Sequence, residues 1–292
     1  MDKLIQTLIS GLSLGSIYAL IALGYTMVYG IAKMLNFAHG DIIMVGAYAV
    51  ITAVFTMGLP PFIAILISIA LCALLGIVIE FLAYRPLRQA QPLAVLITAI
   101  GVSYLLQNLA LLIYGSEQKA FPTIVALPTV HIGGVYIDGI TLATLVVTAV
   151  IMVALSLFIN KTRMGKAMRA VSEDKEAAEL MGISVNRTIT VTFAIGSALA
   201  GVAAIFYGAA YTYIRPTTGA MPGIKAFTAA VFGGIGSIPG AFLGGLLLGI
   251  IEALAKAYIS TQLANSIVFA VLIVVLLVKP AGLLGKIVPE KV

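Results

Sequence analysis

Long apolar runs recur along this chain and limit what it can fold into. The hydrocarbon core of a bilayer is about 30 Å thick, so a helix needs about 20 apolar residues to cross it. Several runs reach that length, and the mean hydropathy of +1.14 is far above that of a water-soluble domain. The sequence therefore predicts an all-α polytopic membrane protein with eight to ten transmembrane or re-entrant helical elements. The candidate segments are 4–30, 41–57, 61–83, 93–114, 139–160, 189–212, 224–258 and 263–279.

Basic residues gather in three groups between these segments. Because Lys and Arg are enriched on the cytoplasmic side of membrane proteins, all three groups are predicted to be cytoplasmic. The same bias explains the net charge of +6 without a nucleic-acid partner. The segment 115–138 has few basic residues and is predicted to be external. The three groups are Arg85 and Arg88; Lys161, Arg163, Lys166, Arg169, Lys175 and Arg187; and Lys279, Lys286 and Lys291.

The segment 224–258 is too long for one ordinary helix. Its centre reads FGGIGSIPGAFLGG, in which Gly233, Gly234 and Gly236 precede Pro239. These residues favour a break or a re-entrant pair of half-helices. With both flanking basic groups inside, the chain must cross an even number of times, which holds if this segment crosses twice or if one element dips in and returns.

Two stretches suggest that the chain consists of two related halves. MLNFAHGDIIMVGAYAV begins at Met34, and TTGAMPGIKAFTAAVFGG begins at Thr217. Each follows a full span and contains a polar or glycine-rich break before a short apolar segment. Broken elements at corresponding places in two halves are typical of a transport site near the membrane midplane. The alternative is that glycines such as Gly240 and Gly244, or Gly11 and Gly15, serve only close helix packing.

Ionisable residues inside apolar segments are costly, so a functional role is considered first for each of them. Glu252 and Lys256 are spaced i, i+4 in the orientation that favours an ion pair on one helix face. Glu80, near the end of its span, is predicted either to reach the interface or to pair with Arg85. The candidates are Asp41, Glu80, Lys225, Glu252 and Lys256.

The stretch LNFAHGD brings Asn36, His39 and Asp41 together, with a glycine between two apolar segments. One interpretation is a break lined by polar groups that face a translocation pathway. The other is a plain cytoplasmic turn in which Asp41 caps the following helix. Both remain open from the sequence. Gln107 and Asn108, within 93–114, are predicted to hold helices together.

The chain shows no catalytic motif. It has no G-x-x-x-x-G-K-[ST] phosphate loop, no complete dinucleotide fingerprint and no G-x-S-x-G elbow. His39 and His131 are far apart in sequence, and no His/Cys cluster offers metal ligands. Neither an enzyme nor a self-contained ATP-driven motor is expected, and no cofactor is predicted.

Residues 161–187 form a polar insertion that is much longer than a turn. Met164, Ala167, Met168 and Val171 follow the i, i+3, i+4, i+7 spacing of an amphipathic helix. A second short helix, with an apolar strip, is expected to follow and to end at a glycine. Ser172 is predicted to cap it, with Glu173 and Asp174 in its first turn. The strip is Ala177, Leu180 and Met181, and the stop is Gly182. A cytoplasmic surface of this kind needs either the lipid interface or a protein partner to cover it.

Three stretches carry a resemblance to a known family. KEAAELMG has the E-A-A-x-x-x-G pattern, at Glu176, Ala177, Ala178 and Gly182, that resembles the coupling loop of permeases in bacterial ABC importers. NFAHGDIIMVGAY and AAVFGGIGSIPGAFLGGLLLGIIEAL resemble the LivH-type permeases of high-affinity branched-chain amino acid importers. The resemblance covers nearly the whole chain.

The resemblance implies one permease domain over 1–292 in the bacterial cytoplasmic membrane, with halves 1–160 and 188–280, a cytoplasmic coupling loop 161–187 and a tail 281–292. It also implies a second permease of the LivM type, two ATPase subunits and an extracytoplasmic amino-acid-binding protein as partners, with membrane lipid around them. Coupling to the ATPase would involve Glu176, Ala177, Ala178, Leu180, Met181 and Gly182. A translocation pathway would involve Asn36, His39, Asp41, Gly233, Gly234 and Gly236.

Two alternatives to branched-chain amino acid import are kept. The first is a permease of the same branch for another small solute, such as a sugar, a nucleoside, urea or an amide. The second is an ion-coupled secondary transporter, which would need unpaired acidic residues near the midplane.

Overall fold

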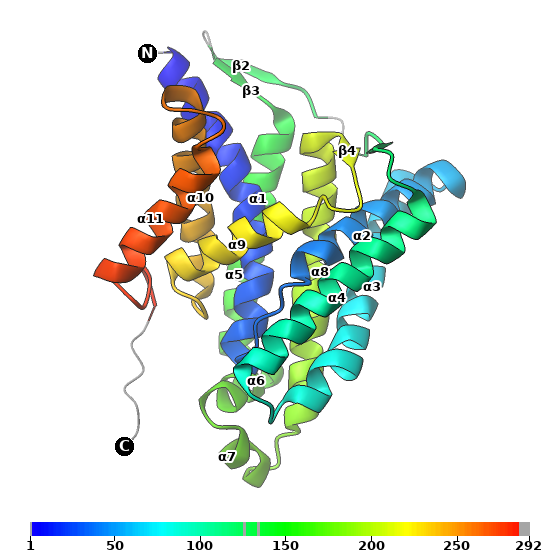
Figure 1. Ribbon diagram of the computed structural model, residues 1–292, viewed down its shortest axis with the longest axis vertical. Helices are drawn as coiled ribbons and strands as arrows, with labels where there is room; N and C mark the ends of the chain where they lie inside the picture. Colours follow the sequence, from blue (N-terminus) through cyan, green and yellow to red (C-terminus); the bar gives the residue numbers. More distant parts are fainter. Residues whose placement is uncertain (1, 125–126, 133–134, 286–292) are drawn as a thin grey trace.

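The computed structural model describes residues 2–124, 127–132 and 135–285, and these residues form an elongated bundle of helices (Figure 1). Lys286 and Lys291, two of the residues predicted to be cytoplasmic, lie outside the described residues. The long helices are α1 (Asp2–Ala32), α3 (Pro61–Ile79), α4 (Pro92–Tyr114), α5 (Gly139–Lys161), α8 (Val185–Tyr211) and α10 (Ile238–Tyr258). The shorter ones are α2 (His39–Ile51), α6 (Arg163–Glu173), α7 (Lys175–Leu180), α9 (Ala220–Gly233) and α11 (Ala264–Val278).

Short irregular helices and strands complete the fold. Two π-helical turns, η1 (Thr52–Thr56) and η2 (Glu80–Tyr84), extend α2 and α3, and a 3-10 turn, η3 (Arg85–Leu87), follows η2. Strand β1 (Lys119–Ala120) pairs antiparallel with β4 (Tyr213–Ile214), and β2 (Val130–Ile132) forms a hairpin with β3 (Val135–Ile137). The predicted external segment 115–138 therefore contains strands but no membrane-spanning element in its described part.

The predicted apolar segments are confirmed as helices. In the described part of the chain, seven helical stretches are long and apolar enough to cross a membrane, and α11 is a shorter apolar helix. The segment 224–258 is broken, as predicted: α9 ends at Gly233 and α10 begins at Ile238. With α9 included, nine helical elements match the predicted range of eight to ten. The protein is an all-α polytopic membrane protein.

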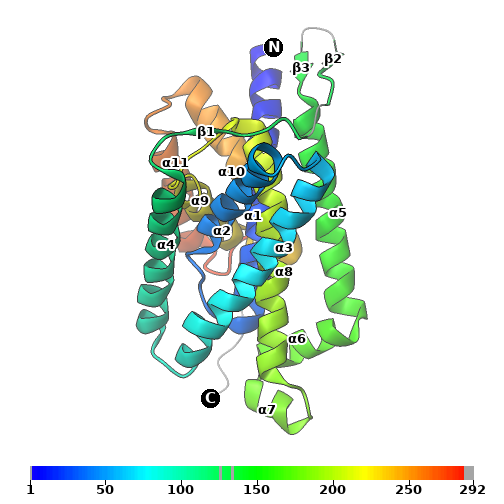
Figure 2. The same ribbon diagram turned by 90° about the vertical axis from the view of Figure 1, so that its right-hand side faces the viewer.

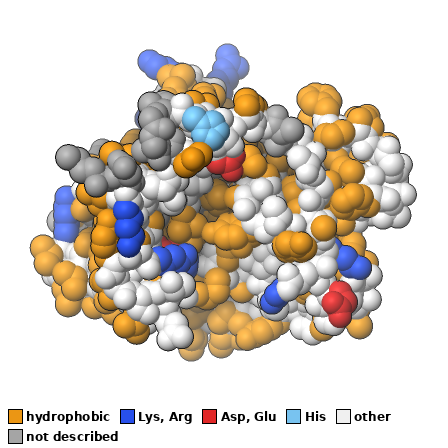
Figure 3. Space-filling view, turned by 90° about the horizontal axis from the view of Figure 1, so that it is seen from above, with side chains coloured by type: hydrophobic (Ala, Val, Ile, Leu, Met, Phe, Trp, Pro, Cys, Tyr) orange, Lys and Arg blue, Asp and Glu red, His pale blue; other side chains and the backbone are white. Residues whose placement is uncertain are grey.

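The molecule has two distinct ends. The N-terminus of α1 and the β2–β3 hairpin lie at one end, called here the hairpin end, and α6 and α7 lie at the other, the loop end (Figures 1 and 2). Figure 3 looks onto the hairpin end, where charged side chains are few and scattered. Helices α9 and α10 run antiparallel, because Gly244 lies against Ala229 and Gly240 lies against Gly233. The broken segment therefore folds back on itself at the turn between α9 and α10.

Glycines allow the central helices to approach closely. A Cβ atom on Gly11 of α1 would lie 2.8 Å from the Cα of Ile250, and one on Gly15 would lie 2.8 Å from the Cα of Leu246. Gly245 and Gly249 of α10 face α1 in the same way. This small-residue contact explains the extensive packing of α1 along α10. For Gly11 and Gly15, the alternative interpretation of close helix packing is the one that the structure bears out.

Candidate functional site

The chain is broken between α1 and α2, and the break is buried. Residues 33–38 leave the end of α1, and α2 begins at His39 at mid height in the bundle (Figure 1). Asn36 and His39 are almost completely buried. Tyr84 donates its hydroxyl to Asn36 Oδ1 at 3.1 Å, and the ring of His39 packs 4.6 Å from that of Tyr25. In the described structure the Asn36 amide nitrogen and the Tyr25 hydroxyl have no hydrogen-bond partner. Most buried polar groups have a partner, so these two atoms distinguish the break from the rest of the core.

Asp41 lies in the first turn of α2 and joins this helix to α4. Its carboxylate accepts hydrogen bonds from Ser103 Oγ at 2.5 Å and from Gln107 Nε2 at 3.0 Å. It does not cap α2, whose N-cap residue is Ala38, so the capping interpretation of Asp41 is wrong. The role predicted for Gln107 in holding helices together is confirmed, whereas Asn108 bonds within its own helix, to the carbonyl of Tyr104.

The N-termini of α2 and α9 meet at one point, which we call the crossing (Gly40, Gly219 and Gly223). A Cβ atom on Gly223 would lie 2.9 Å from the Cα of Gly40, and one on Gly219 would overlap the Gly40 carbonyl. Only glycine permits this approach. Because the N-terminal end of a helix carries a partial positive charge, both helix ends bring such a charge to the crossing, next to the carboxyl group of Asp41 in the first turn of α2. The two stretches singled out in the sequence, from Met34 and from Thr217, are thus adjacent in space.

The other three predicted pathway residues lie away from the crossing. Gly233, Gly234 and Gly236 form the turn between α9 and α10, where Gly234 and Gly236 adopt φ angles of +107° and +93°. The carbonyl of Gly233 accepts a hydrogen bond from the amide of Leu284, at 2.8 Å. The structure therefore separates the two sets of predicted pathway residues. Asp41 lies beside the crossing glycines, of which Gly219 and Gly223 were not among the predicted pathway residues. The sequence signal that could have indicated them is their close spacing on either side of Pro222.

Three charged residues form a buried charge cluster (Lys225, Glu252 and Lys256) on α9 and α10. The Glu252 carboxylate is fully buried and forms salt bridges with Nζ of Lys225 and Nζ of Lys256, each at 2.7 Å. Tyr18 of α1 donates its hydroxyl to the same carboxylate at 3.0 Å. The i, i+4 pair predicted between Glu252 and Lys256 is confirmed. Sequence reasoning missed Lys225 as the third member, because it lies on another helix, 27 residues from Glu252.

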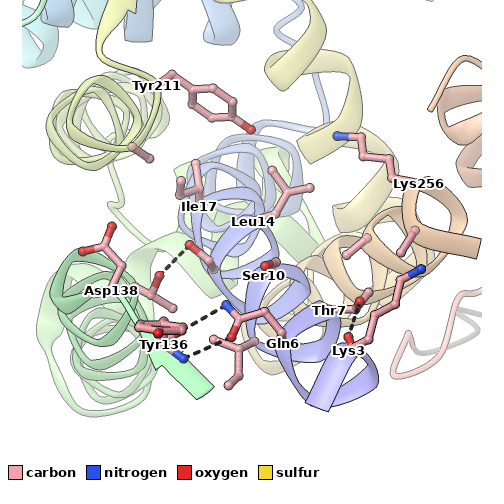
Figure 4. Close-up of a pocket in the computed structure, with 16 residues that line it drawn as sticks. Lys3, Gln6, Thr7, Ser10, Leu14, Ile17, Tyr136, Asp138, Tyr211 and Lys256 are labelled. Carbon is pink, nitrogen blue, oxygen red and sulfur yellow. Dashed lines mark hydrogen bonds between the residues drawn. The ribbon is translucent and has the colours of Figure 1, made fainter. Parts of the chain in front are cut away.

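A cavity of about 670 Å³ opens at the hairpin end among α1, α5, α8 and α10. Figure 4 shows Tyr211 and Lys256 directed toward one another across it, above Leu14 and Ile17. Asp138, which caps α5 by accepting the amide of Ile140, lines the opposite side. Its volume is within the range of pockets that hold small organic molecules, and it combines cationic, anionic and apolar groups. These groups can accommodate a small solute that carries both charges and an apolar part.

The loop helices α6 and α7 leave the bundle at the loop end (Figure 2). Met168 and Val171 are buried on the inner face of α6, which confirms the predicted amphipathic helix. The predicted cap is wrong. Ser172 and Glu173 belong to α6, and Asp174 caps α7 by accepting the amide of Ala177 at 3.0 Å. Helix α6 thus extends one residue beyond the serine, whose hydroxyl donates a hydrogen bond to the carbonyl of Arg169.

Helix α7 presents an apolar surface to its surroundings. Leu180 and Met181 are 89% and 81% exposed, whereas Ala178 is buried against the bundle. Glu176 and Ala177 lie on the exposed side. Gly182 ends the helix with a φ of +78°. Nothing lies within 4 Å of a Cβ built on Gly182, so the backbone conformation, rather than space, calls for glycine.

A buried ion pair fixes the neighbouring turn between α3 and α4. Glu80 is fully buried and pairs with Arg88, which also binds Asn186 at the start of α8. Thr190 of α8 donates to the second Glu80 oxygen at 2.7 Å. The predicted pair with Arg85 is wrong, because the π-helical and 3-10 turns alter the helical spacing. Arg85 lies over the ring of Phe81 instead.

Comparison with known proteins gives a consistent result over the whole chain. A family model described as "Branched-chain amino acid transport system / permease component" matches residues 7–277. The chain is 47% identical to the high-affinity branched-chain amino acid transport system permease protein BraD of Pseudomonas aeruginosa, over 99% of this chain and 98% of that protein. It is 46% identical to the permease protein LivH of the corresponding system of Escherichia coli, over 99% and 97%. The autoinducer 2 import system permease protein LsrD of Salmonella paratyphi B is 28% identical, over 90% and 80%.

Proposed function

This chain belongs to the branched-chain amino acid transport permease family, and from that premise we propose that it is the membrane-spanning subunit of an ATP-driven importer of leucine, isoleucine and valine. The observation that carries the proposal is the identity of 46–47% with BraD and LivH across nearly the full length of each chain. At 28% identity the relatives include both the autoinducer 2 permease and a probable branched-chain amino acid permease of Methanocaldococcus jannaschii, so that level of identity does not distinguish the solute. Similarity at the higher level therefore favours the branched-chain substrate.

The energy source and the other subunits belong to partner chains. The sequence contains no phosphate loop, and α7 exposes Leu180 and Met181 at the loop end. Covering two large and almost fully exposed apolar side chains with a partner surface is favourable, because it removes their apolar area from water. We assign this role to one of two ATPase subunits on the cytoplasmic side, with a LivM-type permease as the second membrane subunit and an amino-acid-binding protein at the hairpin end.

The permease domain consists of two halves of opposite orientation. In the first, the long helix α1 leads through a break into α2 and then α3; in the second, α8 leads through a break into α9 and then α10. Helix α1 packs on α9 and α10, and α8 packs on α2 and α3. Inverted repeats of this kind, with broken helices that meet near the midplane, are typical of transporters. The arrangement supports the predicted two-part organisation.

The crossing and the cavity support a route for an amino acid. A branched-chain amino acid is a zwitterion with an apolar side chain. The cavity at the hairpin end offers Lys256 and Asp138 above an apolar floor, and the electropositive helix ends at the crossing favour a carboxylate. At the crossing Gly40 and Gly219 touch, so passage requires α2 and α9 to separate.

The test is uptake by the complete importer in proteoliposomes. The chain is reconstituted with its second permease, its ATPase subunits and its binding protein, with ATP on the ATPase side. We expect leucine, isoleucine and valine to accumulate only with ATP, and we expect excess ribose, urea or autoinducer 2 to leave leucine uptake unchanged. Uptake driven by an ion gradient without ATP would refute the importer, and preferential uptake of another solute would refute the substrate.

A variant pair tests the role of α7 separately. Leu180→Ser with Met181→Ser removes the exposed apolar surface, while Glu179→Ala changes an exposed polar position on the same helix. We expect the double variant to lose ATPase assembly or ATP-dependent uptake while still inserting into the membrane. Full uptake by the double variant, or equal loss in Glu179→Ala, would contradict docking through this surface.

A further inference from the structure

A second cavity, of about 290 Å³, lies at the loop end, and three cationic side chains from separate segments line it. Lys33 follows the end of α1, Arg88 lies in the turn between α3 and α4, and Lys175 is the first residue of α7. Convergence of three positive charges on one small cavity costs free energy unless an anion offsets it. We call this feature the cationic cavity (Lys33, Arg88 and Lys175, with the residues that line it).

An acidic side chain neutralises only one of these three charges in the described structure. Only Arg88 of the three has an acidic partner there, the buried Glu80, and neither Lys33 nor Lys175 forms a salt bridge with any described residue. The Nε–H group of Arg88 is buried and finds no acceptor among the described residues. Burial, and then the positive charges of Arg88 and Lys33, lower the pKa of Lys175. Two lysines and one arginine N–H thus lack an anionic partner.

The backbone also indicates a constrained position. Lys33 has a φ of +57°, a left-handed conformation that is uncommon for a residue with a side chain. Strained residues of this kind cluster at ligand clamps, where the surrounding structure maintains them. The conformation ends α1 and places the Lys33 side chain in the wall of the cationic cavity.

The rest of the wall is mostly apolar, and on one side it adjoins the outward-facing surface of α4. Pro92, Val95 and Leu96 from the first turns of α4 line the cavity. Leu93 and Ile97, on the same turns, are about two thirds exposed, at 62% and 61%, and face outward. A ligand held here would have its anionic group on the cations and an apolar surface beside it. A free inorganic anion makes no use of such a surface, whereas a lipid uses both.

We propose that the cationic cavity binds the phosphate headgroup of an anionic membrane lipid, with the acyl chains lying along α4. The cavity is at the small end of the size range of ligand pockets, which suits a headgroup better than a nucleotide. Basic pockets between helices on the cytoplasmic side are known to accept such headgroups. A lipid bound there connects α7 to the end of α1 and to the turn before α4, so it stabilises the loop helices against the bundle.

The test uses the complete importer in nanodiscs of phosphatidylcholine with an increasing fraction of phosphatidylglycerol. Native mass spectrometry of the released complex counts retained phosphatidylglycerol, and ATPase activity is measured in parallel. The test variant is Lys33→Gln with Lys175→Gln. We expect it to bind phosphatidylglycerol about 30-fold more weakly. Each lysine near an anionic lipid surface contributes about fivefold to the affinity, and the variant removes two of them. The variant Lys33→Arg with Lys175→Arg, which keeps both charges, should restore binding.

The control removes two charges from the same loop but outside the cavity. Lys161 and Lys166 are exposed, and neither lines it, so Lys161→Gln with Lys166→Gln should retain the lipid. Size-exclusion chromatography confirms that every variant assembles. Equal lipid retention by the test variant and the wild type, or equal loss in the control, overturns the proposal. Displacement of the lipid by millimolar inorganic phosphate identifies a free anion as the ligand and overturns it as well.

Discussion

The charge cluster offers the sharpest test of how this fold is held together. Glu252 is completely buried and accepts hydrogen bonds from Lys225, Lys256 and Tyr18. The two lysines differ in their surroundings. The Lys256 side chain is 40% exposed and can turn to water when its partner is lost, whereas that of Lys225 is only 8% exposed and cannot. The substitution Glu252→Gln preserves the shape of the side chain and removes its charge.

The magnitude follows from these contacts. Removal of one partner from a buried ion pair costs about 3–5 kcal/mol, because the other charge stays buried without compensation. We therefore expect Glu252→Gln to lower the free energy of unfolding by that amount. Lys225→Met in the same chain removes the uncompensated charge, so the two substitutions should couple by about 2–3 kcal/mol, as groups in direct contact do. Lys256→Met should couple less with Glu252→Gln, because Lys256 reaches solvent.

The assay is unfolding by SDS in mixed micelles, followed by circular dichroism, for the wild type, the single variants and the double variants. Two double-mutant cycles are constructed from these values. One gives the coupling energy between positions 225 and 252, and the other gives that between positions 252 and 256. A cost below about 1 kcal/mol for Glu252→Gln would place the carboxylate in the range of solvent-exposed pairs and refute its burial. Strict additivity of Lys225→Met and Glu252→Gln would refute the pairing across α9 and α10.

Three further predictions concern glycines and a buried hydrogen bond. Gly249→Ala should lower the melting temperature in detergent, because its Cβ would overlap the backbone of α1, whereas Gly101→Ala, at an open helical position, should not; equal effects would contradict the close contact. Gly182→Val should abolish ATPase stimulation without preventing insertion, because the branched side chain cannot hold φ +78°, and full stimulation would contradict this. Gln107→Leu should cost about 1.5–3 kcal/mol in the SDS assay, since it removes a donor from the Asp41 carboxylate; no change would contradict that bond.

The helices were predictable because the bilayer imposes a length. Predicted segments such as 93–114 and 139–160 differ by at most one residue at either end from α4 and α5. The glycines and the proline between Gly233 and Pro239 predicted a break in the helix equally well, and the break occurs there. The α6 helix followed from its apolar spacing. These features depend on residues close in sequence and on the thickness of the membrane, and both can be judged from sequence alone.

The contacts of the polar groups were not predictable, because they join distant parts of the chain. Asp41 meets Gln107, which is 66 residues away, and Lys225 meets Glu252, which is 27 residues away. Sequence spacing reveals only neighbours on one helix, such as Glu252 and Lys256. Even that rule failed for Glu80, since two irregular turns changed the spacing of the chain before Arg88. Tertiary packing decides which polar group reaches which partner.

The packing of the loop helices shows how a movement at α7 would reach the crossing. Helix α6 contacts α1, α5 and α8, and α7 contacts α6 and α8. Helices α1 and α8 are the two long helices that precede the breaks, and their breaks lead to α2 and α9, which meet at Gly40 and Gly219. A force applied to α7 by an ATPase would therefore act on both halves at once, one through α1 and the other through α8. In the proposed arrangement of two inverted halves, the same displacement would move the two half-helices in opposite senses, which is what separation at the crossing requires.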